Sequence, residues 1–536
     1  MGTPFAMTTE VDSIKGVAAQ LILADEATIG VLPGSPQYYG LDVNSFGAFG
    51  STQQLLSRRV LSQRRRRLRG DIVAKDVAAD FQVDFTPTIA NKLMPSLMQA
   101  EYFAQPQHGG VFATTPDLTV TSTGYDIGTG AAAAGYIASH LLFAEGFATA
   151  ANNGLKTVTA LSSDEVQVSG LTAEASPPDA AKITVVGIQF GTGELDVVKD
   201  AGNYPTLEIA SGILDWTDYQ LRPGSRIKIG GTATGDRFNT AANNGHARVR
   251  SVSATTLVLD RAPGGADDDT DMSDETGTGK TIKIWLFDQV KDETLDSSLY
   301  ARNTLFMERR LGEPNPVGAA GEIQAEDLFG MVDNTFAIQI GARDKSFIDL
   351  AFLGIDSIEH TGGSGDEIQT DGATILSLPE SGFLNNSSHV RRALLTVVDE
   401  ANGDGAPPPL FNYATQFEIA VSNNAAVLEA VGRATGFDVN TNDFVADVNI
   451  TDWFTDITTK TTIAANTQCQ LEFAWERVIG TSGTGAVVID FPSGSLGNGA
   501  IEVTIDTAMR QTLTFEAAHS EVHDMTMSYN FGRYVE

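Results

Sequence analysis

The sequence predicts an all-β protein with few short helices, and three observations support this. Apolar and polar residues alternate with a period of two in many short runs. The 53 glycines suit tight turns between strands. Threonine and valine are abundant, and both favour extended backbone. Because the alternation leaves one face polar, we expect antiparallel sheets with one side in contact with water or a partner.

The alternating runs are distributed along most of the chain. Phe81, Val83 and Phe85 alternate with Asp80, Gln82 and Asp84, for example. We predict strands over residues 81–85, 336–340, 348–352, 417–421, 444–450, 469–475, 501–505, 513–515 and 525–531. Helical spacing predicts helices over 88–102, where Pro95 should bend the helix, and over 425–432, with a weaker candidate over 14–25.

Charge limits the classes of function. With 68 acidic against 35 basic residues, the formal net charge of the 536-residue chain is −33. Such a chain repels phosphate, which argues against a protein that grips DNA across its surface. It is compatible with a protein past which DNA slides without adsorbing. The length predicts two to four domains.

A basic segment interrupts this acidic composition. It contains Arg58, Arg59, Arg64, Arg65, Arg66, Arg67 and Arg69. A nucleic-acid patch is one interpretation, but interleaved aromatic residues are missing. A flexible solvated loop is another. We favour a basic arm that contacts the acidic surface of a neighbouring copy, because complementary charge sets register between subunits.

The chain contains an internal repeat. Residues 147–154 (FATAANNG) recur as residues 238–245 (FNTAANNG), and apolar strands follow each copy at 183–188 and 282–286. The Asn-Asn-Gly element predicts a hairpin turn with positive φ angles. We therefore expect two small inserted β-modules, at 113–200 and 206–289.

Catalytic, metal and cofactor sites are not predicted. Residues 275–281 end like a phosphate-binding loop but continue into a strand instead of a helix. The acidic run 267–271 lacks the spacing of a calcium loop. His519 and His523 are expected to be surface residues without a third zinc ligand. Cys469, the single cysteine, alternates with apolar residues and is expected to be buried.

Neither a signal peptide nor a membrane span is predicted. The first twelve residues lack a basic and then an apolar region. The most apolar stretch, 130–144, is too short to span a bilayer. We expect the protein to be made and folded in a cytosol.

The order of several motifs resembles the tail tube proteins of long-tailed, non-contractile bacteriophages. These segments are 24–33 (ADEATIGVLP), 69–85 (RGDIVAKDVAADFQVDF), 305–310 (LFMERR), 333–354, 414–430, 435–439 (TGFDV), 444–453 and 487–492 (VVIDFP). The likeness covers about three quarters of the chain and leaves out residues 113–289. It rests on the order of the motifs, because no single motif is specific.

The resemblance implies β-sandwich units whose sheets join those of neighbouring subunits into closed, stacked rings. We expect an N-terminal arm (1–56), a first tube unit (57–112 with 290–362) and a second tube unit (363–536). Rings would then be trimers that imitate hexamers, or true hexamers if each chain holds one unit. The two modules would decorate the outside of the tube.

The resemblance also implies a function and partners. An acidic lumen would let double-stranded DNA pass during ejection, after a tape-measure protein has left it, and other tail proteins would bind the tube ends. The protein would belong to the virion and assemble in the host cytoplasm. Candidate lumen residues are Asp80, Asp84, Asp443 and Asp447. An acidic β-modular adhesin or decoration protein is the alternative, and a β-rich depolymerase is a weaker one.

Overall fold

The computed structural model describes residues 19–57, 69–110, 118–128, 130–132, 134–199, 204–212, 214–261, 272–311, 324–361, 368–378, 384–397, 414–454, 457–479, 483–503, 505 and 508–536. Strands account for 54% of the described residues and helices for 6%, which confirms the all-β prediction. Of the basic segment, only Arg69 lies in the described part of the chain.

A 17-stranded sheet system forms the body of the molecule. Its strands are β1 (Gln20–Asp25), β2 (Tyr38–Leu41), β3 (Ser45–Ser57), β4 (Gly70–Asp84), β20 (Asp288–Lys291), β21 (Leu305–Leu311), β22 (Gln324–Gly341), β23 (Phe347–Gly354), β24 (Asp356–His360), β25 (Ile375–Ser377), β26 (Val390–Val397), β27 (Ala414–Ser422), β30 (Val445–Trp453), β31 (Gln468–Ile479), β32 (Gly483–Glu502), β33 (Arg510–Ala517) and β34 (Ser528–Val535). β1, β2 and β3 come from residues expected to form an N-terminal arm, and here they belong to the body.

Eight of these strands follow one another in an unbroken antiparallel order. The order is β3, β4, β23, β22, β27, β30, β33 and β32. The first four form an N-terminal half-sheet and the last four a C-terminal half-sheet, each with the same strand order. The two half-sheets meet where residues 335–341 of β22 pair with residues 416–422 of β27. One hydrophobic core lies beneath both half-sheets.

The repetition extends beyond the half-sheets. β22 and β32 are the longest strands, and the first part of each pairs elsewhere: β22 with β21 and β24, β32 with β31 and β34. β1 then pairs with β21, and β26 pairs with β31. Each half also has a helix after its second strand, α1 (Pro87–Leu97) after β4 and α2 (Thr458–Ala465) after β30.

The helix predictions had mixed outcomes. α1 overlaps the predicted range 88–102 and begins one residue before it, and the Thr86 hydroxyl caps it by accepting from the Ile89 amide at 3.2 Å. The prediction over 425–432 is wrong, because β28 (Ala426–Leu428) pairs with β29 (Asp438–Asn440) and Val431 is fully exposed. The candidate over 14–25 is also wrong where the structure describes it, because residues 20–25 form the buried strand β1. Its continuous apolar run cannot distinguish strand from helix.

The region between α1 and β20 forms a second sheet system. Eleven strands make the main sheet: β5 (Gln107–Gly109), β8 (His140–Glu145), β9 (Gly154–Thr157), β12 (Lys182–Gln189), β13 (Leu195–Val198), β14 (Thr206–Ile209), β15 (Arg226–Ile229), β16 (Gly245–Val252), β17 (Thr256–Arg261), β18 (Glu275–Thr276) and β19 (Lys283–Leu286). β6 (Thr119–Val120), β7 (Gly124–Asp126), β10 (Ala160–Leu161) and β11 (Glu165–Gln167) form a smaller sheet. Strands from both predicted modules share one sheet and one core, joined by the β12–β19 pairing.

The sequence repeat has the same structure in both copies. Each octapeptide lies in a hairpin connection, β8–β9 or β15–β16, and forms a 3₁₀ turn, η2 (Ala150–Asn152) or η4 (Ala241–Asn243). Asn153 holds the amide and carbonyl of Phe147 at 3.0 and 2.8 Å. In the second copy, Asn244 makes the same two hydrogen bonds to the amide and the carbonyl of Phe238, each at 3.0 Å. The asparagines act through their side chains, and in each copy it is the glycine that has positive φ.

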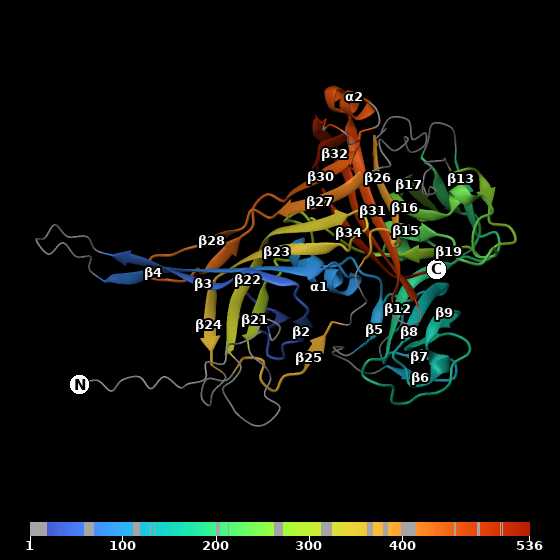
Figure 1. Ribbon diagram of the computed structural model, residues 1–536. Helices are drawn as coiled ribbons and strands as arrows, with labels where there is room; N and C mark the ends of the chain where they lie inside the picture. The colour runs from blue at the N-terminus through green and yellow to red at the C-terminus, as the bar shows by residue number, and fades with distance from the viewer. Residues whose placement is uncertain are drawn as a thin grey trace, which may run out of the picture.

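Figure 1 shows how these parts are arranged. The β3–β4 hairpin projects far from the body at one end. The insert, which also contains the short 3₁₀ turn η3 (Trp216–Asp218), lies at the other end, and α2 lies at the top of the C-terminal half-sheet. In the described part of the chain, no helix is long and apolar enough to cross a membrane.

Candidate channel face and assembly surfaces

The polar face of the eight-stranded sheet carries a row of acidic residues. The register places Gln82 opposite Asp349, and Asp349 opposite Ala337. Continuing across the two half-sheets, Ala337 faces Ala420, Ala420 faces Asp447, and Asp447 faces Glu516. Because side chains directly opposite each other point to the same face, these residues line one surface. This surface is the acidic face.

The adjacent row continues the same surface. Asp84 lies opposite Phe347, and Gln339 lies opposite Glu418. Asp80 lies four residues before Asp84 on β4, and therefore also on this face. Three of the four lumen candidates, Asp80, Asp84 and Asp447, are thus brought together on one sheet. Asp443 is exposed in the connection just before β30.

Amide side chains hold several of these carboxylates in place. Gln82 Nε2 donates to Asp349 Oδ1 at 2.8 Å, and Gln339 Nε2 donates to Glu418 Oε1 at 2.6 Å. Lys345 Nζ lies 2.6 Å from Asp84 Oδ1 at the end of the row. Neutral donors fix the position of a carboxylate without cancelling its charge. The face therefore keeps most of its negative charge.

Two carboxyl groups of the acidic face have raised pKa values. Partial burial raises the pKa of Asp80 above its ordinary value. Partial burial, and then the charge of Glu516 across the strand, raise the pKa of Asp447. Like charges directly opposite each other on neighbouring strands destabilise a sheet. An acidic row of this kind has a cost in isolation, which suggests that it serves a function.

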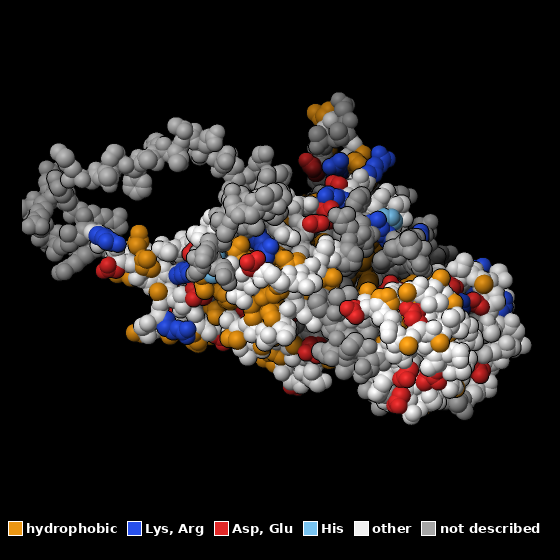
Figure 2. Space-filling model, turned by 90° about the horizontal axis from the view of Figure 1, so that it is seen from below, with side chains coloured by type: hydrophobic (Ala, Val, Ile, Leu, Met, Phe, Trp, Pro, Cys, Tyr) orange, Lys and Arg blue, Asp and Glu red, His pale blue; other side chains and the backbone are white. Residues whose placement is uncertain are grey.

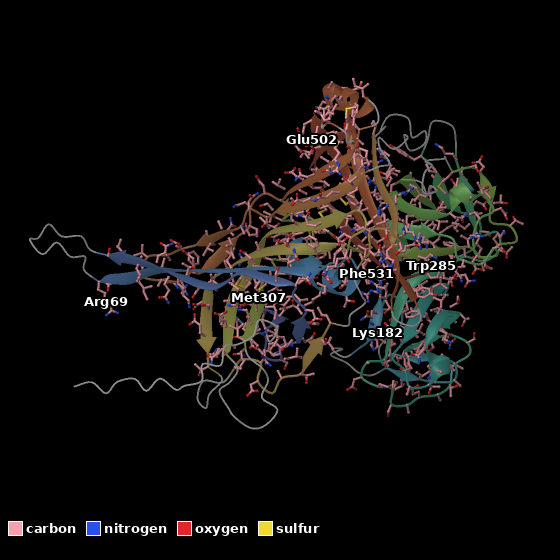
Figure 3. The ribbon with its side chains drawn as sticks, viewed as in Figure 1. Arg69, Lys182, Trp285, Met307, Glu502 and Phe531 are labelled. Atoms are coloured by element: carbon pink, nitrogen blue, oxygen red, sulfur yellow. The ribbon has the colours of Figure 1, made fainter. Side chains whose placement is uncertain are left out.

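The β3–β4 hairpin is a second unusual surface. Leu55, Leu56 and Ile72 are 62%, 68% and 52% exposed near its tip. Arg69 is exposed beside them at the start of β4. Figure 2 shows hydrophobic and basic side chains together at this end of the molecule, and Figure 3 labels Arg69 there. Exposed apolar side chains on a two-stranded projection are typical of a contact surface.

The insert docks on the C-terminal half through a buried ionic cluster. Arg226 Nη2 from β15 lies 2.7 Å from Asp490 Oδ1 and 3.1 Å from Glu472 Oε2. Arg248 from β16 contacts Asp490 at 3.2 Å and donates to Asp260 at 2.9 Å. Although burial opposes it, the charges of Arg248 and His523 hold the pKa of Asp260 below its ordinary value.

A neighbouring group extends this docking interface. Lys228 Nζ and His246 Nε2 lie 2.7 and 2.9 Å from Glu476 Oε1. Lys283 Nζ lies 3.2 Å from Glu536 Oε2 on the last residue. Desolvated ion pairs hold their geometry only when both partners stay in place. The insert is therefore fixed to the sheet and does not hang from it on a linker.

The structure also places the cysteine and the two histidines that the sequence analysis considered as possible sites. Cys469 is buried as predicted, and burial raises the pKa of its thiol to about 11. His519 is exposed, but His523 is buried against Asp260 at 2.7 Å, so the prediction of two surface histidines is wrong for His523. Within the described ranges, no group of three or more His, Cys, Asp or Glu residues could hold a metal ion.

Sequence reasoning missed Asp349, Glu418 and Glu516. Each occupies the polar position of an alternating run. The sequence does not show which strands are neighbours, so these residues could not be grouped with Asp447.

No protein-family model matches the chain, and no curated protein matches it.

Proposed function

We propose that this chain is the structural subunit of a phage tail tube, which assembles into stacked rings with an acidic lumen that conducts DNA. The observation that carries the proposal is the acidic face, which places carboxylates on the same side of both half-sheets of one continuous sheet. The repeated strand order supports two tube units per chain. Three chains would then provide the six units of one ring.

The proposed mechanism follows from charge. With the acidic face toward the lumen, carboxylates would meet the DNA phosphates. Repulsion between like charges would keep the DNA from adsorbing to the wall, so the genome would move through with little friction. Before ejection, the tape-measure protein would occupy the same lumen. The hydrophobic face of each sheet would be covered by the core and the outer strands.

The hairpin supports stacking. Its apolar tip and basic residues would contact the acidic surface of a neighbouring copy, where charge complementarity sets the register. Other tail proteins would bind the ends of the stack. The insert would lie outside the tube as a fixed decoration in the virion.

Electron microscopy of the purified chain tests the proposal. We expect rings or stacked rings with a central channel, whereas discrete monomers at high concentration would count against a tube. The lumen is tested by reversing charge with Glu418→Lys plus Asp447→Lys. Rings should still form but should now bind DNA, and the binding should weaken with added salt.

Asp164→Lys provides the control, because Asp164 is exposed on the insert, away from the acidic face. Rings carrying this change should remain as indifferent to DNA as the wild type. Equal DNA binding by the two variants would show that the acidic face does not line the channel.

A further inference from the structure

The internal junction between the half-sheets supplies a template for the contact between chains. We propose that rings close by addition of β32 of one copy to β3 of the next, antiparallel, with Ile501 facing Phe49 and Val503 facing Phe46. This inference rests on the proposed ring assembly and specifies its contact surface residue by residue.

The equivalence of the two halves is fixed by a shared irregularity. In the N-terminal half, Leu305 pairs with Met331 and Met307 with Leu328, so two residues of β21 span three of β22. In the C-terminal half, Cys469 pairs with Gly494 and Leu471 with Phe491, with the same spacing. Equivalent residues of β22 and β32 therefore differ by 163 in residue number. Met331 corresponds to Gly494, and Leu328 corresponds to Phe491.

The same offset of 163 holds for the next strand. On β23, Asp349 lies opposite Ala337, and on β33, Thr512 lies opposite Ala500. Leu350 therefore corresponds to Leu513. The offset makes Ile338 equivalent to Ile501, and Ile340 equivalent to Val503.

The remaining strands follow from their pairing. Leu350 lies opposite Phe81, which lies opposite Phe46. In the other half, Leu513 lies opposite Ile450, which lies opposite Phe417. Phe46 is therefore equivalent to Phe417. In the next inward-facing pair, Phe49 lies opposite Ala79 and Ile419 lies opposite Val448. Phe49 is therefore equivalent to Ile419.

The pairs at the internal junction predict which residues meet when the outer edges of two copies pair. Within the chain, Ile340 pairs with Phe417 and Ile338 with Ile419. Their equivalents at the outer edges are Val503 with Phe46, and Ile501 with Phe49. The contact is head-to-tail, because it joins two different edges, and such contacts generate rings when the rotation closes.

Exposure supports the transfer. Ile340 is 6% exposed at the internal junction, but its equivalent Val503 is 74% exposed at the outer edge. Phe417 and Ile419 are buried, whereas Phe46 and Phe49 are only half-buried. In the described residues, β3 pairs only with β4, and residues 496–502 of β32 pair only with β33. Such edges, with apolar side chains, favour the addition of another strand.

One local contact must change on assembly. Arg309 Nη2 donates to the Phe49 carbonyl at 3.3 Å, and its guanidinium covers the Phe49 ring at 4.5 Å. The Arg309 side chain would have to move aside when β32 approaches. This contact is consistent with protection of the β3 edge before assembly, because a capped edge is a poor template for random pairing.

Cysteine crosslinking tests the register. Phe49→Cys with Ile501→Cys should form disulfides between copies, because β3 and β32 are opposite edges of the sheet within one chain. Figure 3 labels Glu502, the last residue of β32, at the top of the molecule, and Figure 1 shows β3 well below it. The buried native Cys469 should not interfere. Phe46→Cys with Val503→Cys is a second predicted pair.

The control pair is Phe49→Cys with Val503→Cys, which shifts the register by two residues. The predicted pairs should crosslink at least about tenfold more than this control, since disulfides need closely apposed Cβ atoms. When the single variants Phe49→Cys and Ile501→Cys are mixed, the disulfide-linked dimers should contain one copy of each variant. Wild-type rings whose predicted pairs crosslink no better than the control would refute the register but leave the tube intact. Absence of wild-type rings would overturn both.

Discussion

The two halves of the molecule contain the same buried acid pair but neutralise it differently. Glu308 and Asp327 lie opposite each other on β21 and β22, and Glu472 and Asp490 lie opposite each other on β31 and β32. All four side chains are at most 2% exposed. In the C-terminal half, guanidinium groups surround the pair: Arg226 and Arg248 from the insert, and Arg392 from β26.

The N-terminal pair has fewer cationic partners. Arg310 Nε donates to Glu308 at 2.7 Å, and His360 Nε2 lies 3.2 Å from Asp327. Burial, and then the charge of Glu308, raise the pKa of Asp327 to about 7. Protonation therefore reduces the buried negative charge at Asp327, whereas the charge of Asp490 is balanced by Arg226 and Arg248. The comparison indicates that the insert is an integral part of the C-terminal half.

Removal of an insert arginine should have the largest effect. Arg248→Met leaves Asp490 and Asp260 buried with less compensation, and we expect the free energy of unfolding to fall by about 3–5 kcal/mol. Denaturant unfolding measures the change. Arg391→Met is the matched control, because Arg391 also pairs with an acid of the same half but is 55% exposed. A loss below about 1 kcal/mol is expected there. Equal losses would contradict the role of the buried cluster.

Truncation of the equivalent edge residues should have the next largest effect. Ile340→Ala removes buried methyl groups at the internal junction and should cost about 2–5 kcal/mol of unfolding free energy. Val503→Ala, at the equivalent exposed position, should change the stability of the isolated chain by less than about 0.5 kcal/mol. Thermal or denaturant unfolding of unassembled protein compares the two. A large loss for Val503→Ala would show that this edge is already covered within one chain.

Much of this fold could be predicted from local patterns. Alternation placed Phe81, Ile338 and Val448 on strands and assigned Asp80, Asp84 and Asp447 to polar positions. A period of two depends only on neighbouring residues, so it can be read without knowledge of the fold. It cannot show which strands pair. The β22–β27 junction that unites the two half-sheets joins residues about eighty positions apart, as in Ile338 with Ile419.

The duplication of the body was proposed only from a resemblance, and its residue-level form needed the structure. Aligned by register, the halves share isolated identities such as Asp327 with Asp490, Ile338 with Ile501 and Phe352 with Phe515. Sheets need only apolar residues at alternate positions, so pairing can persist while identities are lost. Likewise, no sequence pattern showed that Arg226 and Arg248 would be buried, because charged strand residues are normally exposed.

Neutralisation by a proton makes the N-terminal half sensitive to pH. Because its folded pKa is raised from 3.8 to about 7, Asp327 contributes stability that is full below its ordinary pKa and is lost as pH rises through about 7. Asp327→Asn should remove this dependence, so the variant should gain about 2–3 kcal/mol relative to wild type between pH 5 and pH 8. Unfolding measured across this range, variant against wild type, isolates the group. Asp490→Asn is the matched test in the other half and should instead destabilise at both pH values, because the arginines lose a partner.

The smallest effect is expected on the acidic face. Glu516→Gln removes the charge opposite Asp447, and relief of this cross-strand repulsion should stabilise the isolated chain by about 0.2–1 kcal/mol at pH 7. The gain should shrink as pH falls, because Asp447 becomes protonated and the repulsion disappears in the wild type as well. Added salt should reduce it too, since the face is partly open to solvent. Thr514→Val changes a neighbour on the same strand without altering charge and shows the effect of substitution alone. A gain that is independent of salt and pH would mean that packing, and not charge, limits the stability of this face.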